Sequence, residues 1–152
     1  MNMLAFILAG LAGTFAMSAF TTMVFKLLRR PYRVITILAA MMQFKPIQFD
    51  HLDTLSKQVP RGILVCAVVL HYSIGIIFTY AYCVVISRGW FSLSLAGAIL
   101  FGAVIGTIGV IGWLVFFKLH PSPPGISLRH YLSTIWMGHV VLAVVAYYVM
   151  LI

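Results

Sequence analysis

The chain has 152 residues, of which 63% are hydrophobic and only 8% are charged, and its formal net charge is +8. This composition lies far outside the usual range of water-soluble domains and gives no support to soluble-enzyme chemistry. We therefore expect an integral membrane protein.

Four uncharged stretches are each long enough to cross a hydrocarbon core of about 30 Å at about 1.5 Å per helical residue. They cover residues 3–25, 62–87, 90–117 and 131–152, so residues 1–152 are predicted to form one all-α transmembrane domain, a four-helix bundle. The first stretch lacks a basic n-region, and its positive cluster follows the apolar run. We therefore expect a retained span and not a cleaved signal.

The basic residues predict the orientation of the chain, and we expect no nucleic-acid partner. The positive-inside rule assigns basic connections to the cytoplasm, so both termini are predicted to lie outside it, with the bacterial inner membrane as the natural setting. Only Arg88 lies on the other side. The remaining basic residues fall between the first two or the last two spans: Lys26, Arg29, Arg30, Arg33, Lys45, Lys57, Arg61, Lys118 and Arg129.

The connection over residues 26–61 is predicted to contain a short amphipathic helix after Pro31, which suits a first helical turn. Its apolar residues would share one face and its polar residues would lie opposite, with Arg29, Arg30 and Arg33 near anionic lipid headgroups. A plain connecting helix is the alternative. The expected apolar face is Val34, Ile35, Leu38, Met41 and Met42, and the polar residues opposite it are Arg30, Arg33 and Thr36.

Asp50 and Asp53 are the only acidic residues of the chain. Their spacing is close to a capping box and predicts a short helix that Asp50 caps and Pro60 closes. A metal site that also uses His51 is the weaker alternative, because capping explains both acids.

Two further connections and the cysteines add constraints. The short sequence SRGW at residues 87–90 predicts that the second and third spans are antiparallel neighbours, and the proline-rich residues 118–129 predict a stiff, extended excursion. Cys66 and Cys83 lie about 25 Å apart along one helix, so no disulfide joins them. We expect both to be buried as small apolar residues.

Each of the two returning spans carries one histidine at the same depth. His71 follows Arg61 by ten residues and His139 follows Arg129 by ten, which places each about 15 Å into the membrane. A polar group at this depth costs several kcal/mol without a partner, so both imidazoles should face the interior of the bundle.

Glycine and threonine pairs in the other two spans suggest a duplication. Gly13-Thr14 and Gly106-Thr107 both lie near mid-depth. Together with the histidines they predict two helical hairpins related by a pseudo-two-fold axis along the membrane normal. Small-residue stripes on the same spans predict close helix packing, or alternatively clearance for a flat ligand. The stripes are Ala9, Gly13 and Ala16, and Ala98, Gly102, Gly106 and Gly109.

Three roles for His71 and His139 stay open. In the structural role, each ring bonds Thr14, Thr107 or a carbonyl near a glycine and fastens hairpin to hairpin. In the second role, both rings ligate the iron of a b-type haem from diagonal helices, although no cation for the propionates lies near.

The third role is transport of protons or of a metal ion. Met17 and Met137 lie near enough in depth to join a soft Cu(I) site. No intramembrane carboxylate accompanies the histidines, however, and proton-coupled transporters commonly use one. Motifs of hydrolases, metalloproteases and nucleotide-binding enzymes are missing from the sequence, so a catalytic role is not favoured.

The chain resembles a group of small, uncharacterised bacterial four-span membrane proteins. The likeness rests on Gly13-Thr14, His71, the sequence KLHPSPP at residues 118–124 and GHVVLAVVAY at residues 138–147. The resemblance implies the fold and the two histidines and implies no activity.

The leading functional hypothesis is a non-catalytic subunit or accessory component of a membrane assembly. It rests on the small size, the small extramembrane connections and the missing catalytic motifs. Its expected partners are the lipid bilayer and other proteins or further copies of this chain, and no cofactor is expected. A haem protein of electron transfer and an ion transporter are the alternatives.

Overall fold

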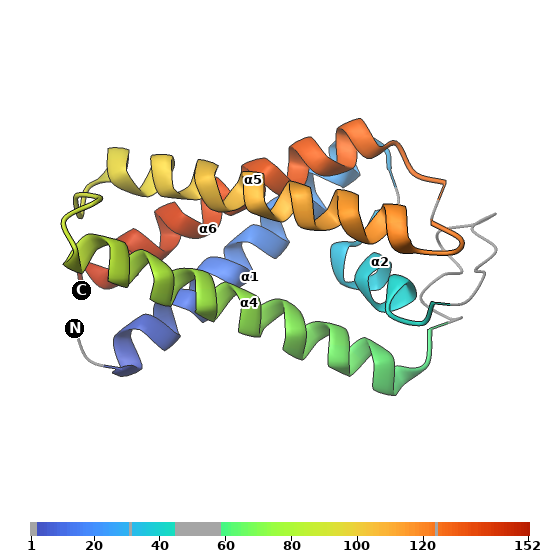
Figure 1. The fold of residues 1–152 in the computed structure, drawn as a ribbon, viewed down its shortest axis with the longest axis horizontal. Coiled ribbons are helices and arrows are strands. Elements are labelled where there is room, and N and C mark those ends of the chain that lie inside the picture. The colour runs from blue at the N-terminus through green and yellow to red at the C-terminus, as the bar shows by residue number, and fades with distance from the viewer. Residues whose placement is uncertain (1–2, 31, 45–58, 124) are drawn as a thin grey trace.

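The computed structural model describes residues 3–30, 32–44, 59–123 and 125–152, and in these residues all regular structure is helical. The four long helices are α1 (Met3–Leu27), α4 (Arg61–Ser87), α5 (Leu95–Leu119) and α6 (Leu128–Met150), and the short helix α2 (Val34–Met41) follows α1 (Figure 1). Each long helix is long and apolar enough to cross a membrane. The chain is therefore a polytopic membrane protein whose described secondary structure is helical. The helix expected at Asp50, and its metal-site alternative with His51 and Asp53, lie outside the described residues.

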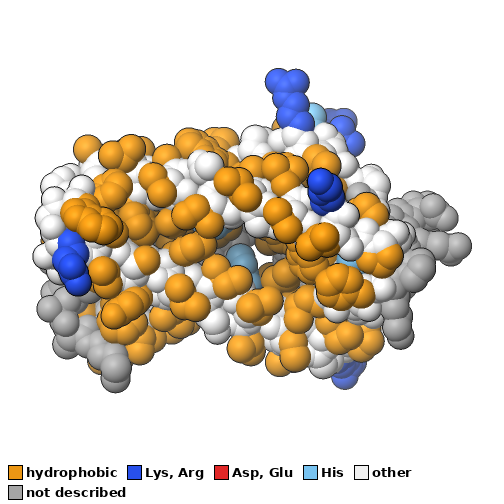
Figure 2. Space-filling view, in the orientation of Figure 1, with side chains coloured by type: hydrophobic (Ala, Val, Ile, Leu, Met, Phe, Trp, Pro, Cys, Tyr) orange, Lys and Arg blue, Asp and Glu red, His pale blue; other side chains and the backbone are white. Residues whose placement is uncertain are grey.

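The start of α1 and the end of α6 lie at the same end of the bundle (Figure 1). Arg88, in the connection after α4, is at this end too, and the other described basic residues lie near the opposite ends of the long helices. Figure 2 shows the corresponding blue side chains gathered mainly at one end. The positive-inside rule uses this asymmetry of charge to predict the orientation of a membrane protein.

The third span begins later than the hydrophobic pattern predicted. α5 begins at Leu95 and not at residue 90, so its connection to α4 covers Arg88–Ser94 and is longer than SRGW. The Ser94 hydroxyl accepts a hydrogen bond from the backbone N–H of Gly97 at 3.1 Å, which is the geometry of a helix N-cap. This local bond, and not hydropathy, sets the start of the helix.

α6 lies at the centre of the helix packing. It packs along both α1 and α5, while α4 packs mainly along α1. The helices α4 and α5, which are consecutive in sequence, approach each other near their connection, where the rings of Tyr82 and Phe101 stack with centroids 4.7 Å apart. Away from that contact they diverge (Figure 1). The two spans are antiparallel, as expected, but they are neighbours only near their connection and do not pack along their length.

Glycines allow the backbones of α1 and α5 to approach α6. A Cβ at Gly13 would lie 2.7 Å from the Leu142 carbonyl oxygen, and one at Gly102 would lie 2.6 Å from Cα of Val140. The missing Cβ of Gly106 likewise leaves room for the Trp136 carbonyl oxygen. The packing interpretation of the small-residue stripes fits these contacts, because dispersion between closely approaching backbones replaces the hydrophobic driving force inside lipid.

The helix contacts do not have the symmetry that two related hairpins would need. A two-fold axis that exchanges α1 with α5 and α4 with α6 would turn the extensive α1–α6 contact into an equal α4–α5 contact. The structure has the first and lacks the second. The two threonines also differ, since Thr14 is buried and Thr107 is exposed.

The short helix α2 differs from the expected amphipathic interfacial helix. Almost all of its residues are buried, and Thr36, which was expected on the polar side, is only 8% exposed. Leu38 and Ala39 belong to a cluster that includes Ala67 of α4 and Trp113 of α5. α2 therefore lies in the space where α4 and α5 diverge, and all of its residues except the half-buried Ile35 are buried.

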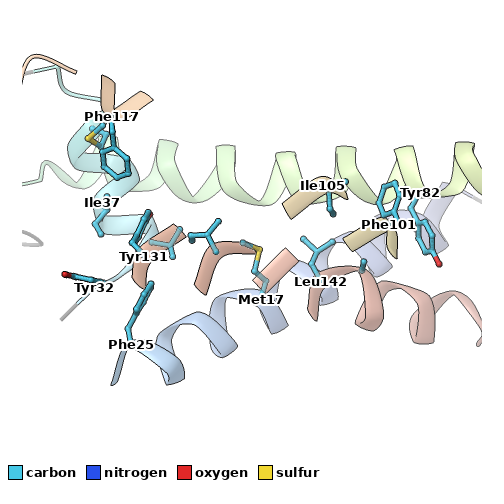
Figure 3. Close-up of a cluster of buried hydrophobic side chains, with 14 of the residues drawn as sticks. Met17, Phe25, Tyr32, Ile37, Tyr82, Phe101, Ile105, Phe117, Tyr131 and Leu142 are labelled. Carbon is cyan, nitrogen blue, oxygen red and sulfur yellow. The ribbon is translucent and has the colours of Figure 1, made fainter. Parts of the chain in front are cut away.

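Aromatic side chains join the helices at the α2 end of the bundle (Figure 3). Tyr131 of α6 stacks on Phe25 of α1, with centroids 5.8 Å apart, and meets Trp113 of α5 edge to face at 5.2 Å. The hydroxyl of Tyr32 accepts a hydrogen bond from the backbone N–H of Ser127 at 2.9 Å. These contacts fasten the connection before α2 to the start of α6.

The cysteines follow only part of the expectation. Cys66 and Cys83 are both free thiols, as their separation along α4 predicted. Cys66 is exposed on the helix surface, however, and Cys83 is half-buried beside the Met150 sulfur at 3.6 Å. A thiol facing lipid incurs no desolvation cost, so nothing forces Cys66 into the core.

Replacing Gly102 with alanine should weaken the contact between α5 and α6. The new methyl group meets the backbone of Val140, which no change of rotamer can relieve, so we expect a loss of about 1–3 kcal/mol in the free energy of unfolding. Unfolding by sodium dodecyl sulfate in mixed micelles measures this change in the free energy of unfolding. Gly112→Ala is the matched control on the same helix, because a Cβ there meets nothing within 4 Å. Equal stabilities of the two variants would contradict the packing role of Gly102.

Candidate functional site

A cavity of about 290 Å³ lies between the diverging parts of α4 and α5, and residues of all five described helices line it. Its walls are mainly apolar, and its polar side chains are Thr14, His71 and His139. Figure 2 shows a hollow in the middle of the molecule with the pale blue of a histidine inside it. The structure thus brings both predicted histidines to one site.

Different contacts bound the cavity at its two ends. The Tyr82–Phe101 stack joins α4 to α5 at one end. At the other end α2 is inserted, and Leu38 of α2 and Phe116 of α5 line the cavity there. Between these ends the described lining residues leave the space between α4 and α5 open.

His71 makes a hydrogen bond to a residue that the sequence did not suggest. Its Nε2 lies 3.1 Å from the Ser18 hydroxyl, so the bond joins α4 to α1. The bond connects the first two spans and not one hairpin to the other. Ser18 follows Thr14 by one helical turn, so the spacing of polar residues on α1 could have indicated it.

His139 bonds within its own helix. Its Nδ1 lies 2.8 Å from the backbone carbonyl of Ile135, one turn earlier. A carbonyl can only accept, so the proton of the neutral imidazole is on Nδ1 and Nε2 is an unprotonated acceptor. No protein donor to Nε2 occurs among the residues that the structure describes.

The ring of His139 is held in place on two sides. A Cβ at Gly109 of α5 would lie 2.7 Å from Cε1 and 3.0 Å from Nε2, so only glycine leaves room for the imidazole there. On another side the ring of Phe78 of α4 meets it edge to face, with centroids 5.7 Å apart. The Cε1–Nε2 edge therefore faces Gly109, which also lines the cavity.

Neither predicted threonine bonds a histidine. Thr14 donates to the Gly10 carbonyl at 2.7 Å and packs its side chain against Gly75 of α4, although it does line the cavity. Thr107 donates to the Ala103 carbonyl at 2.9 Å and lies outside the cavity. Both hydroxyls are satisfied by their own helix, which is the common local bond of threonine in a helix.

The cavity offers few side chains that could bind a metal ion. Met17 lines the cavity and is buried, whereas Met137 is half-exposed on the surface of α6. Among the described residues no group of three or more His, Cys, Asp or Glu side chains comes together. The soft ligands that the cavity offers are therefore two imidazoles and one thioether.

Gly112, Trp113 and Phe78 are among the lining residues that were not singled out from the sequence. Gly112 continues the small-residue stripe three residues after Gly109, and that spacing could have found it. Trp113 and Phe78 are apolar residues in apolar helices, so no sequence signal separates them from lipid-facing positions. The predicted membrane-surface residues Arg29, Arg30 and Arg33 are all exposed, as headgroup contact would require.

Comparisons with known proteins give no match: no family model, no curated protein and no solved structure is significantly similar to the chain. The site must be interpreted from its own chemistry.

Replacing Ser18 with alanine should destabilise the bundle by removing the partner of His71. An interhelical hydrogen bond in a membrane contributes about 0.6–1.7 kcal/mol, and we expect a loss of this size in mixed-micelle unfolding. Ser73→Ala is the control, since Ser73 is exposed on the same helix as His71. If both serine variants unfold at the same detergent concentration as the parent, the Ser18–His71 bond carries no stability.

Proposed function

We propose that this chain is a non-catalytic component of a membrane assembly, and that it holds a small lipid-soluble ligand in the cavity between α4 and α5. The assembly role rests on the small size and the small extramembrane connections of the chain. One observation carries the ligand-holding role: a mainly apolar cavity in the middle of the bundle contains an imidazole nitrogen without a partner among the described residues. Ligand sites in proteins have this character, with apolar walls and a few placed polar groups.

A structural role alone explains the histidines less well. The Ser18 bond gives His71 a packing function. His139, in contrast, uses its own carbonyl for Nδ1, and its Nε2 bonds no other helix in the described part of the chain. An unpaired acceptor in an apolar site lowers stability, so a residue there is best explained by a partner from outside the protein.

Binding of b-type haem is the second candidate, and a specific observation favours it. A histidine that ligates a metal through one nitrogen commonly donates its other N–H to a carbonyl, as His139 does to Ile135. The volume of about 290 Å³ favours a ligand smaller than a porphyrin. Ion transport has less support, because the four spans carry no carboxylate to compensate an ion.

Filling the cavity should abolish retention of the ligand without unfolding the protein. A side chain at Gly112 enters open space, so Gly112→Leu should cut the amount of bound small molecule in native mass spectrometry at least about tenfold. Gly62→Leu is the matched control, since Gly62 also has open space but lies outside the cavity.

The same preparations separate the two candidates. A neutral adduct without visible absorption supports the lipid-soluble ligand, and a Soret band that His139→Ala removes supports haem. Equal retention by Gly112→Leu and the parent would contradict a ligand in this cavity.

For the orientation, we propose that both termini face away from the cytoplasm of a bacterial inner membrane. The concentration of arginine and lysine at the opposite end of the bundle supports this, because basic connections remain in the cytoplasm. A C-terminal alkaline phosphatase fusion should be active and a C-terminal green fluorescent protein fusion dark. The reverse pattern would contradict the proposed orientation.

A further inference from the structure

We propose, resting on the ligand-holding role above, that the ligand is a neutral lipid-soluble alcohol or phenol whose hydroxyl donates a hydrogen bond to Nε2 of His139. Four properties of the cavity lead to this class of molecule: the protonation of the ring, the charge of the spans, the side on which the cavity opens, and its size.

The tautomer of His139 requires that the ligand donate a hydrogen bond. Because the Ile135 carbonyl binds Nδ1–H at 2.8 Å, the other nitrogen offers a lone pair and no proton. An ether, ester or ketone offers only lone pairs as well and would leave Nε2 unpaired. A hydroxyl group supplies the missing proton and satisfies the nitrogen in an apolar surrounding, where an unmade bond is costly.

The charges of the spans disfavour a cation as the partner of that lone pair. Asp50 and Asp53 are the only acids of the chain, and the five helices that line the cavity carry none, so no carboxylate faces the cavity from these helices. A metal ion there would be buried without a compensating negative charge. A neutral hydroxyl meets the same nitrogen without that cost.

The opening of the cavity indicates that the ligand comes from the lipid phase. Ile74 of α4 and Ile108 of α5 both line the cavity and are exposed, by 39% and 53% respectively, so they form its two rims. Figure 2 shows the hollow surrounded by hydrophobic side chains. A molecule dissolved in the bilayer can therefore enter between α4 and α5 without crossing water.

The size of the cavity suits one ring. About 290 Å³ is at the lower edge of the volumes that small-molecule sites occupy, roughly 300–1,000 Å³. Phe78 and Trp113 supply aromatic surface on the α4 and α5 sides. A head group of a single ring can pack between them while an alkyl or isoprenoid tail extends through the opening into lipid.

A matched pair of ligands tests the hydroxyl. 4-Octylphenol and its methyl ether, 4-octylanisole, differ only in the hydroxyl proton. We would titrate both into the protein in mild detergent and follow the fluorescence of Trp113 in a background carrying Trp90→Phe and Trp136→Phe. We expect the phenol to bind about tenfold more tightly than the ether, the ratio that one neutral hydrogen bond provides.

Two variants test whether His139 causes the preference for the phenol over the ether. His139→Phe keeps an aromatic ring beside Phe78 and removes both nitrogens, so it should bind the two compounds equally. His130→Phe is the matched control at an exposed histidine outside the cavity, and it should keep the tenfold preference. A preference that persists in His139→Phe would overturn the assignment.

The outcomes separate this inference from the proposed function. If the parent binds phenol and ether equally and Gly112→Leu binds neither, the cavity holds a ligand but the hydroxyl inference is wrong. If Gly112→Leu binds both as the parent does, the proposed function itself fails. Stoichiometric Cu(I) binding that displaces the phenol and requires His139 would replace the neutral ligand with a metal ion.

Discussion

Close approach of helix backbones at glycine is the constraint on which this bundle depends. Inside lipid, apolar side chains gain little by meeting one another, so the helices associate where backbones come near enough for strong dispersion. Gly13 and Gly102 give α1 and α5 that approach to α6, and both place the missing Cβ less than 3 Å from an α6 backbone atom. α6 therefore joins α1 and α5 into one tightly packed layer.

The cavity forms because α4 does not pack along α5 of this layer. α4 packs mainly on α1, where Gly10 faces Cα of Ile76, and it has no comparable row of contacts with α5. The Tyr82–Phe101 stack and the inserted helix α2 hold the two ends of the α4–α5 gap. The unfilled space lies between them, at the level of the histidines.

The two histidines divide the chemistry of that space. His71 is bonded to Ser18 across the α1–α4 contact, so it contributes to packing. His139 satisfies its proton locally on Ile135 and presents its lone pair toward the side of the cavity formed by Gly109. Two residues of the same type that line one cavity thus differ in what they can offer a ligand.

The sequence by itself determined the class of protein, the four spans and the two inward histidines, because hydropathy, charge and the cost of a buried polar group are local properties. Only the tertiary structure decided that the hairpins are not symmetric, that α2 is buried, and that Ser18 is the partner of His71. Those features depend on which helix faces each glycine, and a stripe of small residues specifies that a close contact forms without specifying the partner.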